Sequence, residues 1–281
     1  MKTTINILRQ TALSLVLAAC AGAVFAQAQK SAQPEQKFEP QVGQAGKDVI
    51  WVPTSQALVD AMMKIGKVTA KDVLYDLGSG DGRTVITAAK LGARAYGIEY
   101  NPDMVELSKA NAAKAGVSER ATFTKADLFE TDFSQANVIT MFLLSSINLK
   151  LRPKILDLKP GTRIVSNTFS MDNWKEDDSV TVSAQDGCST YCVAYFWMVP
   201  AKVGGNWSLG KSELALKQEF QVVNGTLTTD GKSIPVSGRL RGEQFTFTAG
   251  GAQYDGRVSG ASIAGTRKAG SSSSAFSATR R

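Results

Sequence analysis

Three glycines alternate with other residues directly after an acidic residue in the segment DLGSGDGR, which runs from Asp76 to Arg83. Glycine adopts positive φ without strain and has no Cβ, so a turn rich in glycine lets a ligand approach the backbone. The order Asp76-x-Gly78-x-Gly80-x-Gly82 differs from the G-x-G-x-x-G of dinucleotide sites, and no Walker lysine follows it. An acidic residue at the start of such a turn favours a ligand that carries an ammonium group.

Two further acids, Glu99 and Asp127, end later segments of the chain. Glu99 follows the segment AYGI, where a carboxylate can accept hydrogen bonds from both hydroxyls of a ribose. Asp127, in KADLF, can accept from the amino group of an adenine, while Leu128 and Phe129 offer apolar contact to the ring. Each acid alone is equally typical of a helix cap or a surface charge. Three such acids around one glycine turn indicate a nucleoside-binding site.

The elements that must position these residues alternate between strands and helices. The expected strands are VLYDLG, AYGIEY, ATFTKAD, NVITMFLL and TRIVSNTF, and helices are expected at 83–92, 101–116 and 145–158. An earlier helix begins at a cap formed by Thr54, and Pro153 is expected in the first turn or at a kink of the 145–158 helix. This alternation predicts a parallel sheet with helices on both faces.

The pattern changes towards the end of the chain. SVTVSAQ and STYCVAYFWMV predict two more strands joined through DGC, and no helix is expected after Pro200. An apolar-x-Gly-x-apolar pattern then recurs at 223–227, 236–240 and 254–258, which predicts an antiparallel meander or a small barrel. The serine-rich end, GSSSSAFSATRR, either frays or closes the last strand through Phe276.

Cys188 and Cys192 flank the turn that is expected between those two strands. A straight strand would hold residues four apart too far from each other, whereas a turn that brings their Cα atoms within about 7 Å would allow a disulfide. An oxidising compartment would permit that bond. Bonded and free thiols are equally compatible with the sequence.

These segments together resemble the class I S-adenosylmethionine-dependent methyltransferases over about residues 50–200. WVPTSQALVDAM, DLGSGDGR, GIEYNPDMVELSKANA and ADLFETDFS are similar, more narrowly, to the protein-lysine methyltransferases that modify membrane ATP-synthase subunits and to their bacterial relatives. The resemblance implies an α/β fold, a Rossmann-like seven-stranded methyltransferase sheet, here followed by the small antiparallel all-β module. SVTVSAQ and STYCVAYFWMV match the last two strands of that sheet, one of which is antiparallel in the family. It also implies S-adenosyl-L-methionine as cofactor and N-methylation of a protein lysine.

The same resemblance assigns cofactor-binding residues by position. The implied set is Thr54, Asp76, Gly78, Gly80, Asp81, Glu99, Asp127 and Leu128. Gly78 and Gly80 would lie against the amino-acid part of the cofactor, and the two acids of the turn would orient its ammonium end. Glu99 would hold the ribose, and Asp127 with its neighbour would hold the adenine. Thr54 and the preceding Pro53 match the segment that closes over the methionine end.

Histidine is absent from the sequence, which excludes Ser-His-Asp and Cys-His triads and histidine-ligated metals, and we expect no metal site. Methyl transfer tolerates this absence because the enzyme mainly aligns a neutral nucleophile. The segment MFLLSSINLK is expected on the acceptor side and lacks the Asn/Asp-Pro-Pro-aromatic signature of amide and base-amine methylases, so we expect no nucleic acid partner. The catalytic base is not assigned. Asn148 and Asn167 are polar candidates that are equally explained as capping or loop residues.

Residues 1–26 have the order of an export signal. Basic Lys2 and Arg9 precede an apolar stretch that is short for a membrane span and ends in small residues. Cleavage after Ala26 is favoured over lipidation of Cys20 in the lipobox-like LAAC, which would make the protein a lipoprotein. We therefore expect an exported protein, periplasmic or envelope-associated in a bacterium, without a transmembrane span in the mature chain.

The expected organisation is a signal peptide at 1–26, a linker at 27–48, a methyltransferase domain at 49–201 and a basic β module at 202–281. Residues 27–200 hold 19 basic and 20 acidic side chains, whereas residues 201–281 hold 11 and 5. The module is therefore expected to contact an anionic envelope surface, or alternatively to pack on the preceding domain and complete its fold.

The leading hypothesis is an exported methyltransferase with a protein or small-molecule acceptor. Its difficulty is the compartment, because S-adenosylmethionine is made in the cytosol. Two alternatives therefore stay open, a non-catalytic exported binding protein that retains the methyltransferase fold and an envelope-interaction protein.

Overall fold

The structure, a computed structural model, describes residues 38–281. The predicted signal peptide, its Cys20 and the first half of the predicted linker, residues 27–37, lie outside the described residues. Within residues 38–281, no helix has the length and apolar character needed to cross a bilayer.

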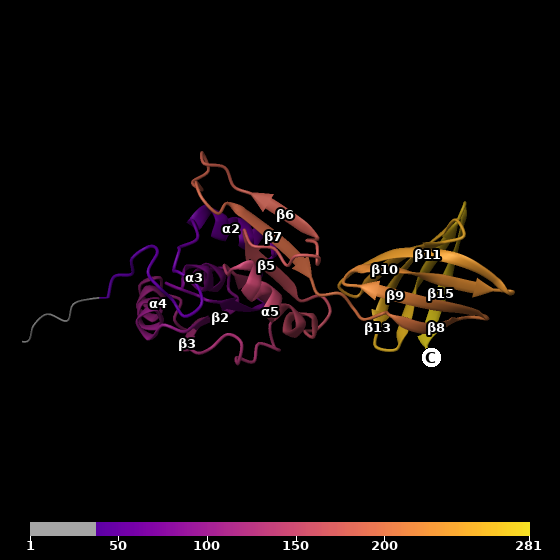
Figure 1. Ribbon diagram of the computed structural model, residues 1–281, viewed down its shortest axis with the longest axis horizontal. Helices are drawn as coiled ribbons and strands as arrows, with labels where there is room; N and C mark the ends of the chain where they lie inside the picture. Colours follow the sequence, from indigo (N-terminus) through magenta and orange to yellow (C-terminus); the bar gives the residue numbers. More distant parts are fainter. Residues whose placement is uncertain (1–37) are drawn as a thin grey trace, which may run out of the picture. The chain divides into compact units, whose positions relative to one another are not determined.

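The first part of the described chain is a seven-stranded sheet with the order β3-β2-β1-β4-β5-β7-β6 (Figure 1). Its strands are β1 (Val73–Leu77), β2 (Arg94–Glu99), β3 (Ala121–Lys125), β4 (Val138–Met141), β5 (Arg163–Asn167), β6 (Asp178–Thr181) and β7 (Val193–Met198). β1 to β5 run parallel, and β7 is antiparallel to both β5 and β6. The predicted methyltransferase-like sheet is confirmed, including its antiparallel last strand.

Helices cover both faces of this sheet, as predicted. They are α2 (Gln56–Ile65), α3 (Arg83–Lys90), α4 (Pro102–Lys114) and α5 (Ser145–Leu156). Buried residues of α2, α3 and α4 share one apolar cluster with the sheet, whereas α5 contributes Ile147, Leu151 and Ile155 to a second cluster. The chain proceeds from β1 to β2 and β3 on one side, and then to β4 and β5 on the other. Where the strand order reverses in this way, between β1 and β4, open α/β sheets have a crevice at the carboxyl ends of the strands.

The predicted cap of α2 is wrong. Ser55, not Thr54, caps this helix, because its hydroxyl accepts a hydrogen bond of 3.3 Å from the amide of Leu58. Pro153 lies in the last turn of α5 and not in its first, because that helix begins at Ser145, soon after β4. The alternative, a kink at Pro153, stays a prediction. Helix α4 starts as predicted, with Asn101 as its cap and Pro102 in its first turn, since the sequence range expected for it begins at Asn101 and the Asn101 side chain accepts from two amides of the first turn.

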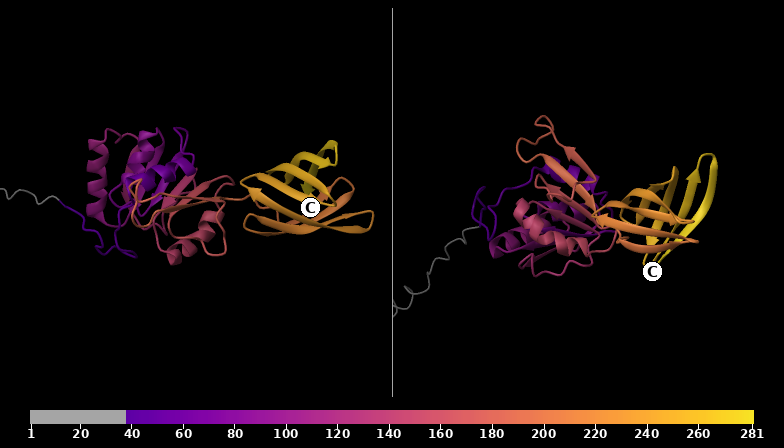
Figure 2. Two further views of the ribbon diagram at one scale, coloured as in Figure 1. Left: turned by 90° about the horizontal axis from the view of Figure 1, so that it is seen from above. Right: turned by 45° about the vertical axis from the view of Figure 1, so that its right-hand side comes forward.

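The rest of the chain forms a closed antiparallel barrel, drawn from orange to yellow in Figure 2. Its strands are β8 (Gly205–Leu209), β9 (Ser212–Glu219), β10 (Val222–Thr229), β11 (Lys232–Arg241), β12 (Gln244–Ala249), β13 (Ala252–Ser259), β14 (Ser262–Ala269) and β15 (Ser272–Arg280). The serine-rich end is β15, which pairs with both β14 and β8 and so closes the barrel. The recurring glycines make room for close packing. A Cβ at Gly238 would lie 2.6 Å from Phe247, and one at Gly256 would lie 2.8 Å from Phe276.

The barrel contacts the segment that precedes β6. Phe220 stacks on the buried Trp174 with ring centroids 5.8 Å apart. Gln221 donates to the carbonyl of Lys175 over 2.7 Å, and Arg239 pairs with Asp177 over 2.7 Å. These contacts join the basic module to the preceding domain through apolar, polar and charged side chains.

Candidate active site

A cavity of about 550 Å³ lies at the carboxyl ends of the central strands. Its lining comes from residues 44–54, from the glycine turn after β1 and from the residues that end or follow β2, β3 and β4, together with Phe169 and Tyr191. The structure brings every residue of the predicted set to this cavity, namely Thr54, Asp76, Gly78, Gly80, Asp81, Glu99, Asp127 and Leu128. Pro53 also lines it. Their roles towards a cofactor stay predictions.

The glycine turn holds its residues at positive φ, 81° at Gly78, 54° at Gly80 and 82° at Gly82. The amides of Gly78 and Ser79 donate to the carbonyl of Ile98 over 2.9 and 3.0 Å, which ties the turn to β2. A Cβ at Gly82 would lie 2.8 Å from the Phe123 ring, so that glycine serves packing inside the fold. The other two line the cavity.

Trp51 occupies the space beside Gly80, where a Cβ would lie 2.7 Å from the indole Nε1. The tryptophan belongs to a short hairpin in which the amide of Gly43 donates to Trp51 and the amide of Trp51 donates to Gln44, each over 2.9 Å. Residues 44–48, which the sequence pattern placed in the linker, therefore form part of the cavity wall. Their polar, aperiodic composition contains no signal for this role.

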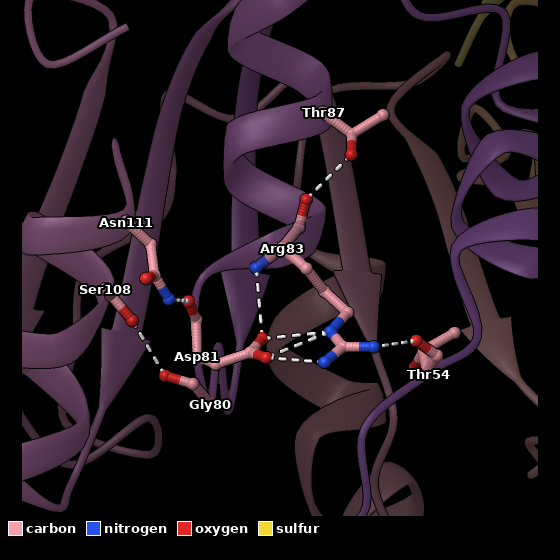
Figure 3. Close-up of polar contacts among 7 residues, drawn as sticks. All are labelled: Thr54, Gly80, Asp81, Arg83, Thr87, Ser108 and Asn111. Carbon is pink, nitrogen blue, oxygen red and sulfur yellow. Dashed lines mark hydrogen bonds and ion pairs between the residues drawn. The ribbon is translucent and has the colours of Figure 1, made fainter. Parts of the chain in front are cut away.

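Two side chains of helix α4 support the turn (Figure 3). The Ser108 hydroxyl donates to the carbonyl of Gly80 over 2.8 Å, and the Asn111 amide donates to the carbonyl of Asp81 over 3.0 Å. Both acceptors are backbone groups of the turn. The conformation of the turn is therefore fixed by side chains that do not themselves line the cavity.

Asp76 is a buried carboxylate, 5% exposed, at the edge of the cavity. Its pKa is raised to about 7, mainly by burial. Hydrogen bonds from Thr140 and Thr84 oppose this shift, and the negative charges of Glu99 and Asp81 add to it. A cation that entered the cavity beside Asp76 would stabilise the ionised form. This carboxylate is therefore well suited to an ammonium group.

Asp81 is engaged by Arg83, as Figure 3 shows. The Nε and Nη2 atoms of Arg83 donate to the Asp81 carboxylate over 3.0 and 2.6 Å, and Nη1 donates over 2.7 Å to the carbonyl of Thr54. The guanidinium thus links the glycine turn to the segment before α2. Sequence reasoning missed Arg83, although it lies within the DLGSGDGR motif and two residues after its partner.

Glu99 joins the turns that follow β1 and β2. One carboxylate oxygen accepts from the amide of Gly80 and the other from the amide of Asn101, each over 2.9 Å. An ionised carboxylate has about four acceptor sites, so two backbone bonds leave capacity for a ligand that lies in the cavity.

Asp127 has two partners in the structure. It accepts from the amide of Phe129 over 2.9 Å, and the ammonium of Lys47 bonds its second oxygen. The bond from Lys47, followed by that from Phe129, lowers the pKa of the Asp127 carboxyl. Lys47 also lies over the Tyr100 ring, with its nitrogen 5.0 Å from the centroid. This lysine was not predicted.

The segment MFLLSSINLK, which was predicted on the acceptor side, contributes apolar residues to the cavity, whereas the polar candidates Asn148 and Asn167 do not line it. Phe142, Leu143, Leu144 and Ile147 of MFLLSSINLK line it. Asn148 and Asn167 instead hold loops. The Asn148 side chain donates to the carbonyl of Phe169 over 3.0 Å, and that of Asn167 donates to the Thr54 hydroxyl over 3.1 Å.

Cys188 and Cys192 form a disulfide with Cα atoms 5.6 Å apart. The sequence left this bond open because it depends on the turn. Here the intervening Tyr191 adopts a φ of 56°, which turns the chain back on itself.

Known proteins are similar in sequence to this chain. Residues 76–178 match the ANTKMT methyltransferase domain. The protein-lysine N-methyltransferase of Saccharolobus islandicus strain REY15A is 42% identical over 154 residues, which are 54% of this chain and 94% of that protein. An ATP synthase lysine N-methyltransferase of Mus musculus is 34% identical over 128 residues, which are 45% of this chain and 51% of that protein.

A solved structure is also similar to this chain. The RNA methyltransferase from Salinibacter ruber in complex with S-adenosyl-L-homocysteine is 45% identical, with a TM-score of 0.50, and the match covers 54% of this chain and 96% of that one. The fold and the cavity define a class I S-adenosylmethionine-dependent methyltransferase. Within that class, the chain belongs to the protein-lysine N-methyltransferase family.

Proposed function

We propose that the protein methylates the side-chain amine of a lysine in a protein substrate and holds S-adenosyl-L-methionine across the ends of β1, β2 and β3. The observation that carries this proposal is the set of hydrogen-bond acceptors at those strand ends, Asp76, Glu99 and Asp127, around a turn in which two of the three glycines line the cavity. The ammonium, the ribose hydroxyls and the adenine amino group of this cofactor are all donors. The side chains present therefore fit its donor groups in chemical type.

The roles that we assign follow the order of the strands. Asp76 receives the ammonium end, beside Gly78 and Gly80, which line the cavity. Glu99 accepts from the ribose hydroxyls, and Asp127 accepts from the adenine, with Leu128 against the ring. Asp81 acts through Arg83, which supports the turn and the segment at Thr54.

When bound, S-adenosyl-L-methionine supplies an activated methyl group and the leaving group for its transfer. The protein then has to align a neutral amine and exclude water, and correct orientation alone lowers a barrier by about 7–11 kcal/mol. The hairpin at residues 43–51 and the apolar side chains after β4 enclose the cavity and contribute to this task.

We also propose that the protein works outside the cytoplasm, in the periplasm or at the envelope. The order of residues 1–26 supports this, and so does the Cys188–Cys192 disulfide, because disulfides persist in oxidising compartments and are rare in reducing ones. A reporter fused after residue 60, with and without residues 1–26, tests export. A fusion that stays in the cytoplasm with residues 1–26 present contradicts it.

The enzymatic proposal is tested by two measurements on the mature chain. Calorimetry with S-adenosyl-L-methionine measures cofactor binding. Incubation with labelled cofactor and separate protein and RNA fractions from the envelope and the cytosol, followed by mass spectrometry, identifies the acceptor. Methyl-lysine in a protein band is the expected product. Cofactor binding without transfer to any fraction favours the binding-protein alternative, and label in RNA alone overturns the lysine assignment.

A further inference from the structure

We propose that Phe142, Phe169 and Tyr191, here called the aromatic wall, bind the alkyl-ammonium end of the methyl acceptor, and that the Cys188–Cys192 disulfide positions Tyr191 in this wall. The inference rests on the proposed function and adds a recognition element on the acceptor side of the same cavity.

The three rings form a continuous aromatic surface. Phe142 meets Tyr191 edge-on with centroids 5.2 Å apart, and Phe169 lies 6.0 Å from Phe142 and 6.2 Å from Tyr191. All three residues line the cavity. Phe142 and Phe169 are half-buried, whereas Tyr191 is 44% exposed and forms the outer rim of the wall.

The topology of the sheet explains why residues so distant in sequence meet. Phe142 directly follows β4 and Phe169 comes shortly after the parallel β5, so both lie at the carboxyl edge. Tyr191 precedes β7, which runs antiparallel to β5 and places Ala194 opposite Asn167. The wall thus occupies the half of the edge above β4, β5 and β7. The acids proposed to bind the cofactor, Asp76, Glu99 and Asp127, occupy the half above β1 to β3.

The chemistry of this surface suits a cation on an apolar stem. The faces of aromatic rings attract cations, and the attraction is largest for weakly hydrated ones such as methylated ammonium groups. Leu144 and Ile147 lie in the same part of the lining and can contact the methylenes of a lysine side chain. The acids that line the cavity, Asp48, Asp76, Asp81, Glu99 and Asp127, all come from residues 48–127, before β4.

The absence of acids among the described cavity residues that follow β4 has a functional consequence. A carboxylate at the acceptor position would form an ion pair with the protonated amine and oppose the loss of the proton that makes the amine nucleophilic. An aromatic wall holds the same group more weakly. It can therefore bind the amine, its ammonium form and the methylated products.

The disulfide holds the exposed member of the wall. Tyr191 lies inside the short loop that Cys188 and Cys192 close, and it adopts a φ of 56°, a conformation that residues other than glycine rarely take. Cys188 is buried, with 3% of its surface exposed, and so anchors one end of the loop. The other end is fixed where the amide of Thr168 donates to the carbonyl of Val193 over 2.7 Å. When the disulfide is reduced, the backbone at Tyr191 is no longer anchored through Cys188.

The first experiment compares a cation with a neutral molecule of the same shape. The probes are the N-acetyl, N-methylamide derivative of trimethyllysine and its isostere in which carbon replaces the quaternary nitrogen, titrated by NMR into the mature chain with S-adenosyl-L-homocysteine present. We expect the wild-type protein to bind the cation about 5- to 30-fold more tightly than the isostere. Equal affinity for the two probes overturns the proposal.

Matched variants test whether the ring of Tyr191 causes the preference for the cation. Tyr191→Leu should reduce the preference for the cation to less than twofold, while Tyr191→Phe, which keeps the ring, should retain it. Affinity for S-adenosyl-L-homocysteine should stay unchanged in both variants. If the wild-type protein does not bind S-adenosyl-L-homocysteine at all, the proposed function fails. If it binds but Tyr191→Leu keeps the full preference, only the aromatic wall fails.

A double-mutant comparison tests the disulfide. Replacing both cysteines, Cys188→Ser with Cys192→Ser, should reduce the preference for the cation as Tyr191→Leu does, and adding this pair to Tyr191→Leu should reduce it no further. A disulfide that only stabilised the fold would lower the Tm in both backgrounds and leave the preference of the otherwise wild-type chain intact. That result would overturn its positioning role.

Discussion

Asp76 and Thr140 lie opposite each other on the adjacent strands β1 and β4, and the Thr140 hydroxyl donates a hydrogen bond of 2.7 Å to the Asp76 carboxylate. Both side chains are buried. β1 and β4 are also the strands between which the chain switches sides, so this pair lies at the point where open α/β sheets bind their ligands. A buried acid with a raised pKa at this point links ligand binding to pH.

The first prediction concerns stability without ligand. Because the pKa of Asp76 is about 7 in the folded protein and 3.8 in an ordinary carboxyl, the folded state binds a proton more tightly than the unfolded state. The stability that this proton gives is fully present below about pH 4 and is lost as the pH rises through 7, on the order of 4 kcal/mol in all. Denaturant unfolding at pH 5 and pH 8 should show the part of this fall that lies between those two values, about 2–3 kcal/mol, in the wild-type chain and a smaller fall in Asp76→Asn. The same fall in both would contradict the assignment to Asp76.

Cofactor affinity should depend on pH in the opposite direction. An ammonium group binds the ionised carboxylate, so below the pKa of Asp76 binding must displace a proton, and affinity should rise by up to about tenfold per pH unit between pH 5.5 and 7. Calorimetry in two buffers of different ionisation enthalpy measures the proton released. Asp76→Asn should bind weakly, without this release. Wild-type affinity that is flat over the same range would remove Asp76 from the ammonium site.

Glu99→Ala should weaken cofactor binding by about 1–3 kcal/mol, as expected for a lost charge-assisted hydrogen bond. Part of this loss is indirect, because Glu99 also accepts from the amides of Gly80 and Asn101. Glu99→Gln separates the two contributions, since its one carbonyl oxygen can keep a single backbone bond. Circular dichroism should show that both variants stay folded. Unchanged calorimetric affinity in Glu99→Ala would exclude the residue from the site.

Gly80→Val should abolish cofactor binding, because a side chain at φ 54° is strained and its Cβ would meet Trp51 at the cavity wall. Gly116→Ala is the matched control. Gly116 has a φ of 69° but no atom within 4 Å of an added Cβ, so this variant carries the backbone strain without the obstruction. We expect the control to lose about 1 kcal/mol of stability and to keep its affinity. Tight binding by Gly80→Val would show that the turn is only a structural connection.

Much of the site could be predicted because its residues follow from local patterns. Parallel strands bring their carboxyl ends to one edge, so Asp76, Glu99 and Asp127 could be brought together once the strands were recognised. The glycine turn carries its own signal, since only glycine adopts these φ values without strain. The antiparallel last strand came from the family resemblance rather than from periodicity.

The missed residues depend on tertiary packing. Lys47 and Trp51 reach the cavity through a hairpin whose sequence has the composition of a linker. The pairing of Arg83 with Asp81 and Thr54 requires the position of α2 relative to the turn. Tyr191 becomes a cavity residue through a turn and a disulfide, neither of which the spacing of two cysteines determines. Side chains placed by long-range contacts have no signature in a single sequence.

The last prediction concerns the barrel. No residue of the described cavity lining comes from residues 202–281, so their removal should leave cofactor affinity within about twofold. The same truncation exposes Trp174, which Phe220 covers, and should therefore lower the Tm by several degrees. If the truncated chain is insoluble or cannot bind the cofactor, the barrel is part of the catalytic fold and this prediction is wrong.

A milder variant tests the proposed role of the barrel at the envelope. Lys217, Lys232 and Lys268 are exposed on its strands, and changing all three to Gln lowers the net charge without touching the apolar interior. If charge holds the barrel at an anionic surface, this variant should dissociate from vesicles that contain anionic lipid at a lower salt concentration than the wild-type chain does. Salt weakens such an attraction because the screening length is only about 8 Å at physiological ionic strength. Cosedimentation over a salt series measures the difference. Since the variant keeps the contacts of Phe220 and Arg239, equal salt dependence in the two proteins would show that the barrel completes the fold and does not hold the enzyme at a charged surface.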